Sequence, residues 1–189
     1  MFVAKFLRAL PAIAAMLLPL PTVAAEWAVD PARSEIVFEY QRAGAPANGI
    51  FAEFSGTGSM DAAEPGAATL EIRISTESID LYDTMASAFA TSAEWFDSKN
   101  HPDVIYRLHT LNPIEPPRYE AQGTLTIRGK SQPITTEIRL EIGETQATAS
   151  GTLKIVRNDY LLGVGPSAAF VEIGPDVGVR FDLTASRTN

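Results

Sequence analysis

Apolar and polar residues alternate most regularly between Gly123 and Ile142. The pattern has two arms, residues 123–128 and 134–142. In each arm every second residue is apolar, apart from Gly123 and Thr136, and the residues between them are polar. A period of two indicates strands with one buried face, so we predict an antiparallel hairpin. We place its turn at residues 129–133, because this segment begins with glycine and ends with proline. A lone hairpin is marginal in water, so its apolar face requires further strands.

The same alternation recurs along most of the chain. It predicts strands at residues 27–29, 36–40, 50–60, 70–74, 104–108, 147–156 and 171–183. One face of the segment 50–60 is unusually small, with Ile50, Ala52, Phe54, Gly56, Gly58 and Met60. A later strand repeats this character with Ala147, Ala149 and Gly151. Inward residues of this size either leave space for a slender ligand or are covered by larger neighbours.

One stretch departs from the period of two. Met85 and Phe89 are four residues apart with alanines between them, and Thr84 can cap a helix, so we predict one short amphipathic helix here. About eight strands, one helix and the lack of repeats or linkers predict an all-β fold. The economical architecture is a single antiparallel barrel or sandwich.

The first residues have the pattern of a secretory signal peptide. Lys5 and Arg8 precede an apolar run over residues 9–20, and small residues at 23–25 form a cleavage signal before Glu26. The run contains prolines and is shorter than the roughly 18 residues of a membrane span, which disfavours an anchor. We therefore predict a signal peptide at residues 1–25, a mature domain at residues 26–189, and export to a bacterial periplasm.

Charge and cysteine content narrow the function further. Removing Lys5 and Arg8 from 15 Lys and Arg leaves 13 against 23 Asp and Glu, a net charge of −10. This charge disfavours nucleic acid and anionic membrane surfaces as partners. The chain has no cysteine, so it has neither disulfides nor a thiol nucleophile, and its core must hold the fold.

No pattern in the sequence predicts catalysis or a metal site. His101 and His109 are the only histidines, and one strand would place them about 27 Å apart, too far to share a metal. An ion held by His101 with Asp97 or Asp103 is an alternative to a simple loop histidine. No serine lies in a G-x-S-x-G motif, and residues 163–166 lack the strand and helix around a phosphate loop. We therefore predict no catalytic residues and no metal.

Three segments together resemble a known family. Residues 49–56 resemble its G-x-F-x-x-F-x-G strand, residues 92–97 with Pro102 resemble its S-x-x-F-F-D…P segment, and residues 123–135 are similar to its hairpin motif. These motifs, in this order, are those of the YceI-like family, and the resemblance covers essentially the whole mature chain. It implies an exported, lipocalin-like barrel that binds a long isoprenoid or similar amphiphile in an elongated internal cavity.

Two departures from the family pattern concern the ligand's headgroup. Relatives often have His-x-Arg where this chain has residues 89–91, Phe-Ala-Thr, and R-x-D-F-G where it has residues 157–161. The first difference makes the helix more apolar and favours a less charged headgroup, such as that of an isoprenoid quinone. Forms with a similar alanine-rich helix resemble modules that accompany membrane b-type cytochromes.

The resemblance implies a ligand site made of inward-facing residues. We predict as ligand-binding Phe38, Ala52, Phe54, Met85, Phe89, Trp95, Phe96, Tyr106, Ile138, Leu140, Ala149, Leu153, Tyr160 and Phe170. For four aromatic residues of this set, Trp95, Phe96, Tyr106 and Tyr160, the sequence leaves open whether they are core or the rim of a lipid entrance.

We interpret the chain as a periplasmic carrier of an isoprenoid lipid or quinone, without a covalent cofactor and without chemistry of its own. Two alternatives remain at this stage. One is an accessory to a membrane cytochrome in quinone-linked electron transfer, and the other is an enzyme of unrecognised type. A homodimer also remains open.

Overall fold

The computed structural model describes residues 24–61, 64–166 and 170–188. Its strands are β1 (Ala25–Val29), β2 (Glu35–Arg42), β3 (Ala45–Phe51), β4 (Phe54–Met60), β5 (Thr69–Ser75), β6 (Ile79–Asp80), β7 (Asp103–Glu115), β8 (Arg118–Ile127), β9 (Lys130–Ile142), β10 (Gln146–Val156) and β11 (Ile173–Arg187). Its helices are α1 (Thr84–Ala90) and the short 3-10 turns η1 (Pro31–Arg33), η2 (Pro65–Ala67), η3 (Thr76–Ser78) and η4 (Arg157–Tyr160). None of the helices in these described ranges combines the length and the apolar character that a bilayer span requires.

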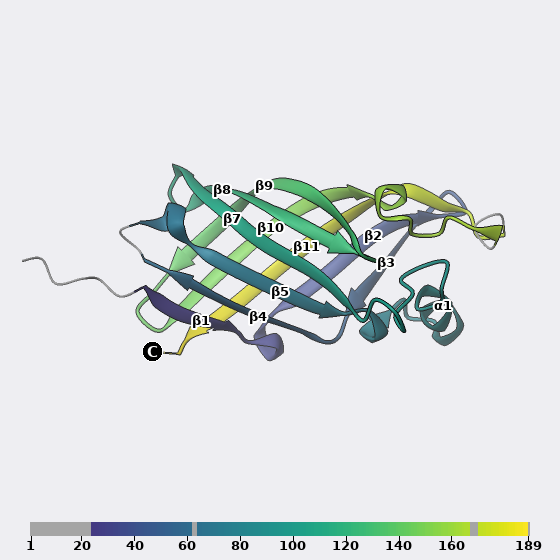
Figure 1. The fold of residues 1–189 in the computed structure, drawn as a ribbon, viewed down its shortest axis with the longest axis horizontal. Coiled ribbons are helices and arrows are strands. Elements are labelled where there is room, and N and C mark those ends of the chain that lie inside the picture. Colours follow the sequence, from purple (N-terminus) through teal and green to yellow (C-terminus); the bar gives the residue numbers. More distant parts are fainter. Residues whose placement is uncertain (1–23, 62–63, 167–169, 189) are drawn as a thin grey trace, which may run out of the picture.

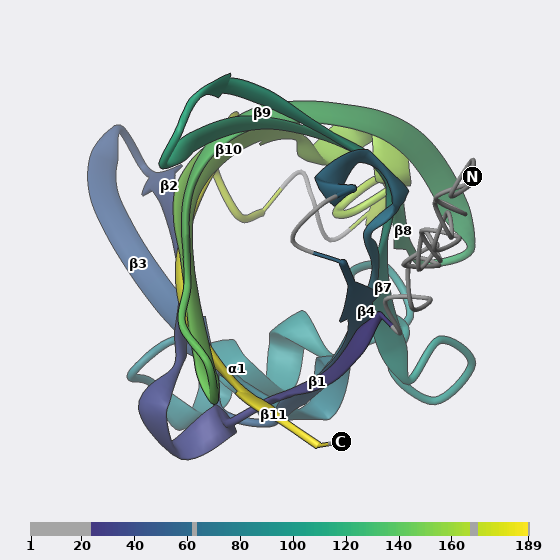
Figure 2. The ribbon, with the colours of Figure 1, turned by 90° about the vertical axis from the view of Figure 1, so that its left-hand side faces the viewer.

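The strands form one closed antiparallel barrel. Three positions of the barrel are each occupied by two short strands in succession, which together act as one kinked strand. These are β1 with β2, β3 with β4, and β5 with β6, and the two strands of each pair border the same neighbours. With β7 to β11, this makes eight barrel strands. Pairing of both β1 and β2 with β11 closes the ring, which Figure 2 shows along its axis. The predicted barrel of about eight strands with one helix is confirmed, and the closure decides against a sandwich.

The barrel has two distinct ends (Figure 1). Helix α1 and the β10–β11 connection lie at one end, which we call the α1 end. The start of β1 and the end of β11 lie at the other, which we call the terminal end. The predicted signal peptide falls mostly on residues 1–23, which lie outside the described residues.

The predicted hairpin is present as β8 and β9, but its turn is shorter than predicted. Arg128 and Gly129 both have positive φ, 49° and 69°, and they join the strands directly. This is the geometry of a two-residue hairpin turn. Pro133 therefore lies inside β9, opposite Thr124. A proline fits there because β9 pairs with β10 only over residues 138–142. On the β10 side of residue 133 there is no paired strand, so the N–H that proline lacks is not needed for a hydrogen bond.

The predicted continuous strand at residues 50–60 is wrong, because the chain breaks at Ala52 and Glu53. The backbone N–H of Ala52 donates to the carbonyl of Ser78, and that of Glu53 donates to the Ser78 hydroxyl, at 3.1 and 3.0 Å. The break changes which alternate residues face inward. Phe51 lies inside before the break and Gly58 after it, whereas Ala52 is exposed at the break itself.

Helix α1 is capped one residue earlier than predicted. Asp83 is the N-cap, and its carboxylate accepts a hydrogen bond from the N–H of Ala86 at 2.8 Å. The predicted apolar face of Met85 is not the buried one, because Met85 is 85% exposed. Ala86 and Ala90 face the barrel instead. Small residues on this face let the helix lie close to the barrel end.

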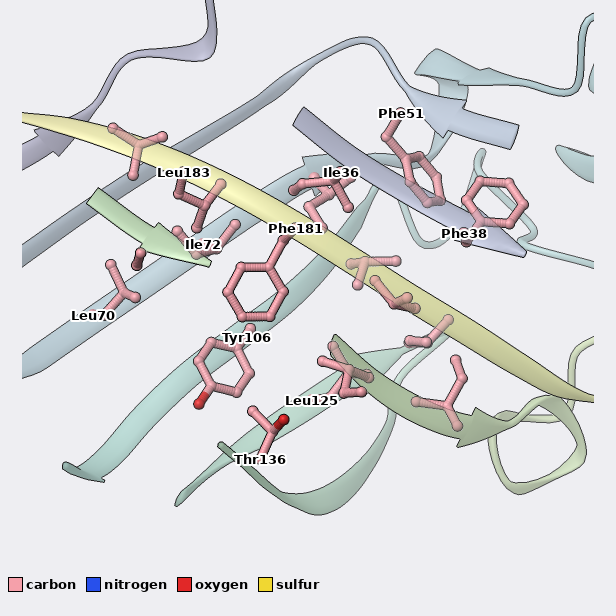
Figure 3. Close-up of a pocket in the computed structure, with 18 of the residues that line it drawn as sticks. Ile36, Phe38, Phe51, Leu70, Ile72, Tyr106, Leu125, Thr136, Phe181 and Leu183 are labelled. Carbon is pink, nitrogen blue, oxygen red and sulfur yellow. The ribbon is translucent and has the colours of Figure 1, made fainter. Parts of the chain in front are cut away.

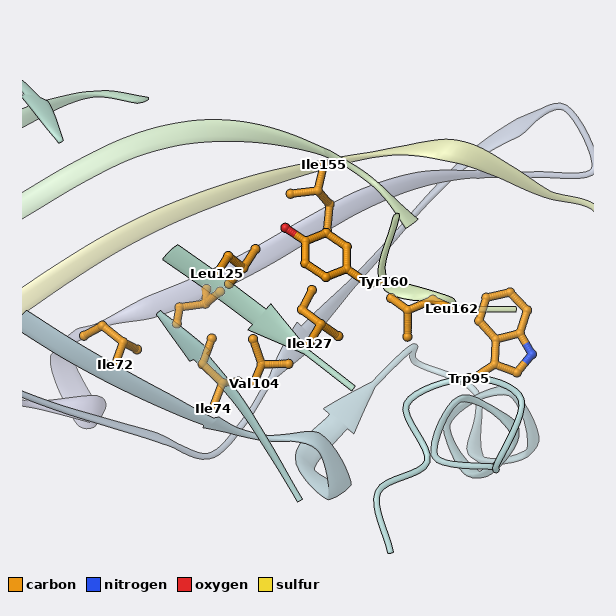
Figure 4. Close-up of a cluster of buried hydrophobic side chains, with 10 residues drawn as sticks. Ile72, Ile74, Trp95, Val104, Leu125, Ile127, Ile155, Tyr160 and Leu162 are labelled. Carbon is orange, nitrogen blue, oxygen red and sulfur yellow. The ribbon is translucent and has the colours of Figure 1, made fainter. Parts of the chain in front are cut away.

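Two clusters of buried side chains hold the barrel. The larger one lies toward the α1 end (Figure 4) and consists of Ile36, Ile72, Ile74, Trp95, Val104, Leu125, Ile127, Ile155, Tyr160 and Leu162. The smaller one, toward the terminal end, consists of Ala68, Leu111, Tyr119 and Ala121. Between these clusters the inward side chains of opposite strands do not fill the interior.

Candidate functional site: the barrel lumen

The interior of the barrel contains a cavity of about 340 Å³. This volume falls within the roughly 300–1,000 Å³ of small-molecule pockets in proteins. Side chains from strands on all sides of the barrel line it, and nearly all are apolar. Figure 3 labels ten of them: Ile36, Phe38, Phe51, Leu70, Ile72, Tyr106, Leu125, Thr136, Phe181 and Leu183.

The cavity is elongated along the strands. In β11, alternate residues from Val177 to Ala185 line it without interruption. The eight steps along the strand from Val177 to Ala185 correspond to about 27 Å of length. The lining also includes Trp27 toward the terminal end and Trp95 toward the α1 end. The shape therefore suits a long, slender apolar molecule.

Small residues explain only part of the empty space. Ala147 and Ala149 line the cavity, as their small size predicts. Gly58 also lines it but leaves no room, because a β-carbon there would lie 2.3 Å from the carbonyl oxygen of Thr69. Gly56 does not leave room, because a β-carbon there would lie 2.6 Å from Val29 Cγ2. The phenyl ring of Phe181 occupies the space beside Gly151, where a β-carbon would lie 2.8 Å from the ring. The remaining volume lies between inward side chains of opposite strands that do not fill the interior.

Arg157 ties together the segments at the α1 end. Its guanidinium donates hydrogen bonds of 2.6 to 3.2 Å to the backbone carbonyls of Leu162, Gly163, Ile173 and Gly174. It also stacks on Trp95, with Cζ 5.5 Å from the ring centroid. Burial lowers the pKa of Arg157, although a guanidinium remains charged at neutral pH. Arg157 therefore orders this end of the barrel by donating to carbonyl groups rather than by an ion pair.

Arg128 makes a second connection across this end. It donates to the carbonyl of Leu161 and, at 2.6 Å, to that of Ala93. In addition, the N–H of Gly163 donates to the carbonyl of Glu94 at 2.8 Å. The segment after α1 and the segment after η4 are thus bonded to each other and form one cap.

Few polar side-chain atoms line the lumen. Tyr40 and Arg42 lie at the α1 end, where Arg42 is exposed. Tyr106 and Thr136 lie farther inside (Figure 3). Burial raises the pKa of Tyr106 to about 12, so its hydroxyl is neutral at physiological pH. No carboxylate is among the lining side chains of the described residues.

A family comparison agrees with this geometry. The family model of the YceI-like domain matches residues 27–185. The chain belongs to the YceI-like family. The match covers nearly the whole barrel, from within β1 to the last part of β11, and confirms the resemblance seen in the sequence motifs.

Several relatives of this YceI-like chain are known. A UPF0312 protein of Shewanella baltica is 27% identical over 180 residues, which cover 88% of this chain and 94% of the relative. The structure of BcnA from Burkholderia cenocepacia has a TM-score of 0.76 and 26% identity, and it covers 82% of this chain and 98% of that one. A polyisoprenoid binding domain from Saccharophagus degradans has a TM-score of 0.71 and 17% identity, over 86% and 98% of the two chains. At this identity the last comparison concerns the fold alone.

Eight of the fourteen predicted ligand-binding residues line the lumen of this YceI-like barrel. They are Phe38, Trp95, Phe96, Tyr106, Ile138, Leu140, Ala149 and Leu153. For the aromatic set, the structure gives a mixed answer. Trp95 is buried and at the same time part of the lining, whereas Tyr160 is only 1% exposed and belongs to the core.

The other six predicted residues, Tyr160 among them, lie away from the lumen. Ala52 is exposed at the strand break, and Met85 and Phe170 are 85% and 88% exposed. Phe54 packs against the larger cluster, and Phe89 lies against Trp95 with ring centroids 6.0 Å apart. Ala52 and Phe54 lie outside the lumen because of the strand break, and Met85 and Phe89 because of the orientation of α1. Both features depend on contacts with distant segments.

Several lining residues were not predicted as ligand-binding. Phe51, Leu125 and Phe181 are examples, and each lies at the level of the lumen that Figure 3 draws. The alternation of apolar residues would have placed Phe181 on the inward face, since it is two residues from both Val179 and Leu183 on the same strand. No local signal marks Phe51, because its inward position follows from the break after it.

The histidines do not form a metal site in the structure. His101 Nε2 lies 4.0 Å from the Asp97 carboxylate in the loop before β7. His109 is exposed and hydrogen-bonds the Thr124 hydroxyl at 2.7 Å. Across the part of the chain that the structure describes, no group of three or more His, Cys, Asp or Glu could hold a metal ion.

Proposed function

We propose that this YceI-like protein binds and carries a long-chain isoprenoid amphiphile in the lumen of its barrel. The single observation that carries the proposal is the elongated apolar cavity of about 340 Å³. A barrel that only needed stability would fill this space, because unfilled interior volume destabilises a fold. An apolar ligand supplies the missing contacts.

The chemistry of the lining sets the kind of ligand. Burying each CH₂ group contributes about 0.8 kcal/mol, while association costs roughly 4 to 15 kcal/mol in lost freedom. A ligand with several isoprene units is therefore needed for a complex that survives purification. The polyisoprenoid binding domain from Saccharophagus degradans has the same fold, which supports an isoprenoid over other long lipids.

We also propose that the protein acts after export, in the periplasm. The support is the signal-peptide pattern of residues 1–25 and the lack of cysteine. In this compartment a carrier would shield an isoprenoid lipid or quinone from water between membranes. If the ligand is a quinone, a membrane b-type cytochrome is the partner we expect. Amino-terminal sequencing of the periplasmic protein should begin at or near Glu26, and a product that keeps Met1 would contradict export by cleavage.

Reloading of the delipidated protein tests the proposed function. The protein is stripped of lipid under denaturing conditions, refolded, and incubated with a polyprenol or an isoprenoid quinone before native mass spectrometry. We expect one amphiphile per chain and a higher unfolding temperature, because a ligand that binds only the folded state stabilises it. Failure of both amphiphiles to bind a correctly refolded barrel would contradict the proposal.

A further inference from the structure

Large apolar side chains are exposed at the α1 end of the barrel. They come from two segments that project beyond the strands there, α1 with the turn before it and the connection between η4 and β11 (Figure 1). Met85 and Phe170, one from each segment, are 85% and 88% exposed. Exposed apolar side chains that gather in one place indicate an interaction surface. We call this set the end patch: Tyr82, Met85, Phe89, Leu161, Val164 and Phe170.

The two segments of the end patch are held together. The ring centroid of Phe89 lies 6.0 Å from that of Trp95, and a β-carbon on Gly163 would lie 2.6 Å from the same indole. The N–H of Gly163 also donates to the carbonyl of Glu94 at 2.8 Å. The segment that carries Phe89 and the segment that carries Val164 therefore form one surface, with Trp95 between them.

The end patch is continuous with the lumen. In α1, Ala90 lines the cavity while its neighbour Phe89 is exposed, and after η4, Leu162 lines the cavity while Leu161 is exposed. Trp95, which lies against Phe89, is itself part of the lining. The same short segments thus carry apolar side chains toward the cavity and toward the outside. An apolar molecule that leaves the lumen here meets apolar surface along its path.

The size and shape of the end patch restrict the partner that fits it. A stable interface between two proteins takes roughly 20 to 30 residues on each side. The end patch offers six apolar side chains on two projecting segments. Projecting aromatic and aliphatic side chains suit the headgroup region of a bilayer, into which they insert to a shallow depth.

Charge restricts the kind of bilayer. The mature chain has 13 basic against 23 acidic residues, so an anionic membrane surface repels it. At the α1 end, exposed charges of both signs lie close to the end patch in the sequence or on neighbouring turns, as Asp83, Lys99 and Lys130 show. A zwitterionic surface, without net charge, therefore suits this end better than an anionic one.

We propose that the end patch docks on the surface of a zwitterionic lipid bilayer, so that the α1 end of the lumen faces the membrane with which it exchanges its ligand. Met85 and Phe170 are the side chains that insert into the headgroup region. The inference rests on the proposed function, because it describes how the same lumen is loaded and emptied. An apolar ligand then passes between bilayer and barrel without crossing water, which is the costly step for apolar surface.

Co-sedimentation with vesicles of phosphatidylethanolamine and phosphatidylcholine tests the docking surface. The bound fraction gives a partition coefficient for the wild type, for Met85→Ser with Phe170→Ser, and for the control Ile114→Ser with Ile142→Ser. The control removes two exposed apolar side chains at the terminal end of the barrel. Burial of one large apolar side chain corresponds to a roughly tenfold or greater change in partitioning. Binding of a polyprenol in vesicle-free solution is measured on the same three proteins.

We expect Met85→Ser with Phe170→Ser to bind vesicles at least about tenfold more weakly than the wild type, and the control to bind like the wild type. Adding phosphatidylglycerol should weaken vesicle binding, and all three proteins should bind the polyprenol equally. The inference is overturned if both double variants lose vesicle binding equally, if neither loses it, or if the wild type binds only anionic vesicles.

Light scattering provides the test of a second copy as the occupant. A wild-type dimer that Met85→Ser with Phe170→Ser converts to a monomer, without vesicle binding, would assign the end patch to a dimer interface and overturn the inference. A wild type that binds the polyprenol but no vesicles contradicts only the docking surface. A wild type that binds no polyprenol contradicts the proposed function itself, and the inference fails with it.

Discussion

The phenol ring of Tyr106 lies over the backbone of Gly123 on the neighbouring strand. A β-carbon on residue 123 would come within 2.6 Å of the Tyr106 hydroxyl oxygen, and it would also meet the carbonyl oxygen of Arg107. The glycine is therefore what allows a large aromatic side chain to lie along the wall of the lumen. Phe181 has the same relationship to Gly151 on the other side of the barrel.

Substitution of Gly123 by alanine should destabilise the barrel. The added methyl group meets a backbone carbonyl, which cannot turn aside, so the strands or Tyr106 must shift. Overpacking of this kind costs about 1 to 3 kcal/mol or more in the free energy of unfolding. Urea denaturation measures it. Gly178→Ala is the matched control, because a β-carbon there meets nothing within 4 Å, and it should change stability by less than about 1 kcal/mol. Equal effects of the two changes would contradict the close approach at Gly123.

Arg157→Met should loosen the α1 end. The change leaves four backbone carbonyls without their donor, and a hydrogen bond to a charged group contributes about 1.5 to 3 kcal/mol. We expect a loss of at least about 2 kcal/mol, and Arg157→Lys should not restore it, because an ammonium lacks the planar fork.

The control for this change is Arg107→Met. Arg107 forms an exposed ion pair with Glu71 at 2.7 Å, and such pairs contribute about 0 to 1 kcal/mol. Chemical denaturation of the three variants gives the comparison. A similar small loss for Arg157→Met and Arg107→Met would show that Arg157 does not hold the cap together.

Sequence periodicity predicted the barrel well because an antiparallel sheet with one buried face repeats every two residues. The central hairpin and β11 are examples, where alternate apolar residues from Val177 to Leu183 line the lumen. Periodicity misplaced the hairpin turn, since it cannot distinguish a two-residue turn at Arg128 and Gly129 from a longer loop. Pro133 was misleading for the same reason, because proline is also compatible with an unpaired strand side.

The site was less predictable than the fold, for reasons of tertiary structure. The break that exposes Ala52 depends on hydrogen bonds to Ser78, which is far along the chain. Which face of α1 is buried depends on the barrel end it covers, so Met85 became exposed and Ala90 buried. Whether space remains in the lumen depends on the inward side chains of all strands together, so no local sequence pattern predicts it.

Stability should fall at alkaline pH as buried tyrosines ionise. Burial raises the pKa of Tyr106 and of Tyr160 from 10.0 to about 12. Between these values the unfolded chain loses protons that the folded chain retains, so this contribution is complete below pH about 10 and declines as the pH rises to about 12. The unfolding midpoint measured from about pH 9 to 12 should therefore decrease.

Tyr106→Phe and Tyr160→Phe together should make this decrease shallower. Tyrosinate absorbance provides the second measurement, since the folded protein should ionise part of its five tyrosines only at higher pH or on unfolding. Ionisation of all five near pH 10 in a protein that remains folded would contradict the burial of these hydroxyls.

Ala149→Trp separates ligand binding from folding. Ala149 lines the lumen, so the indole should occupy space that the ligand needs while adding apolar surface that the barrel buries. We expect a large loss of bound lipid with a small change in the free energy of unfolding. Thr152→Trp, on the exposed face of the same strand, should retain the lipid. A packed lumen would instead give a loss of about 1 to 3 kcal/mol of stability for Ala149→Trp.

The most direct test of the lipid-binding lumen is solvent extraction of the natively purified protein, followed by mass spectrometry of the extract. We predict a long isoprenoid amphiphile at about one molecule per chain in the wild type and in Thr152→Trp, and little in Ala149→Trp. Recovery of only short or polar molecules, or an equal lipid load in all three proteins, would contradict a lumen built to hold such a ligand.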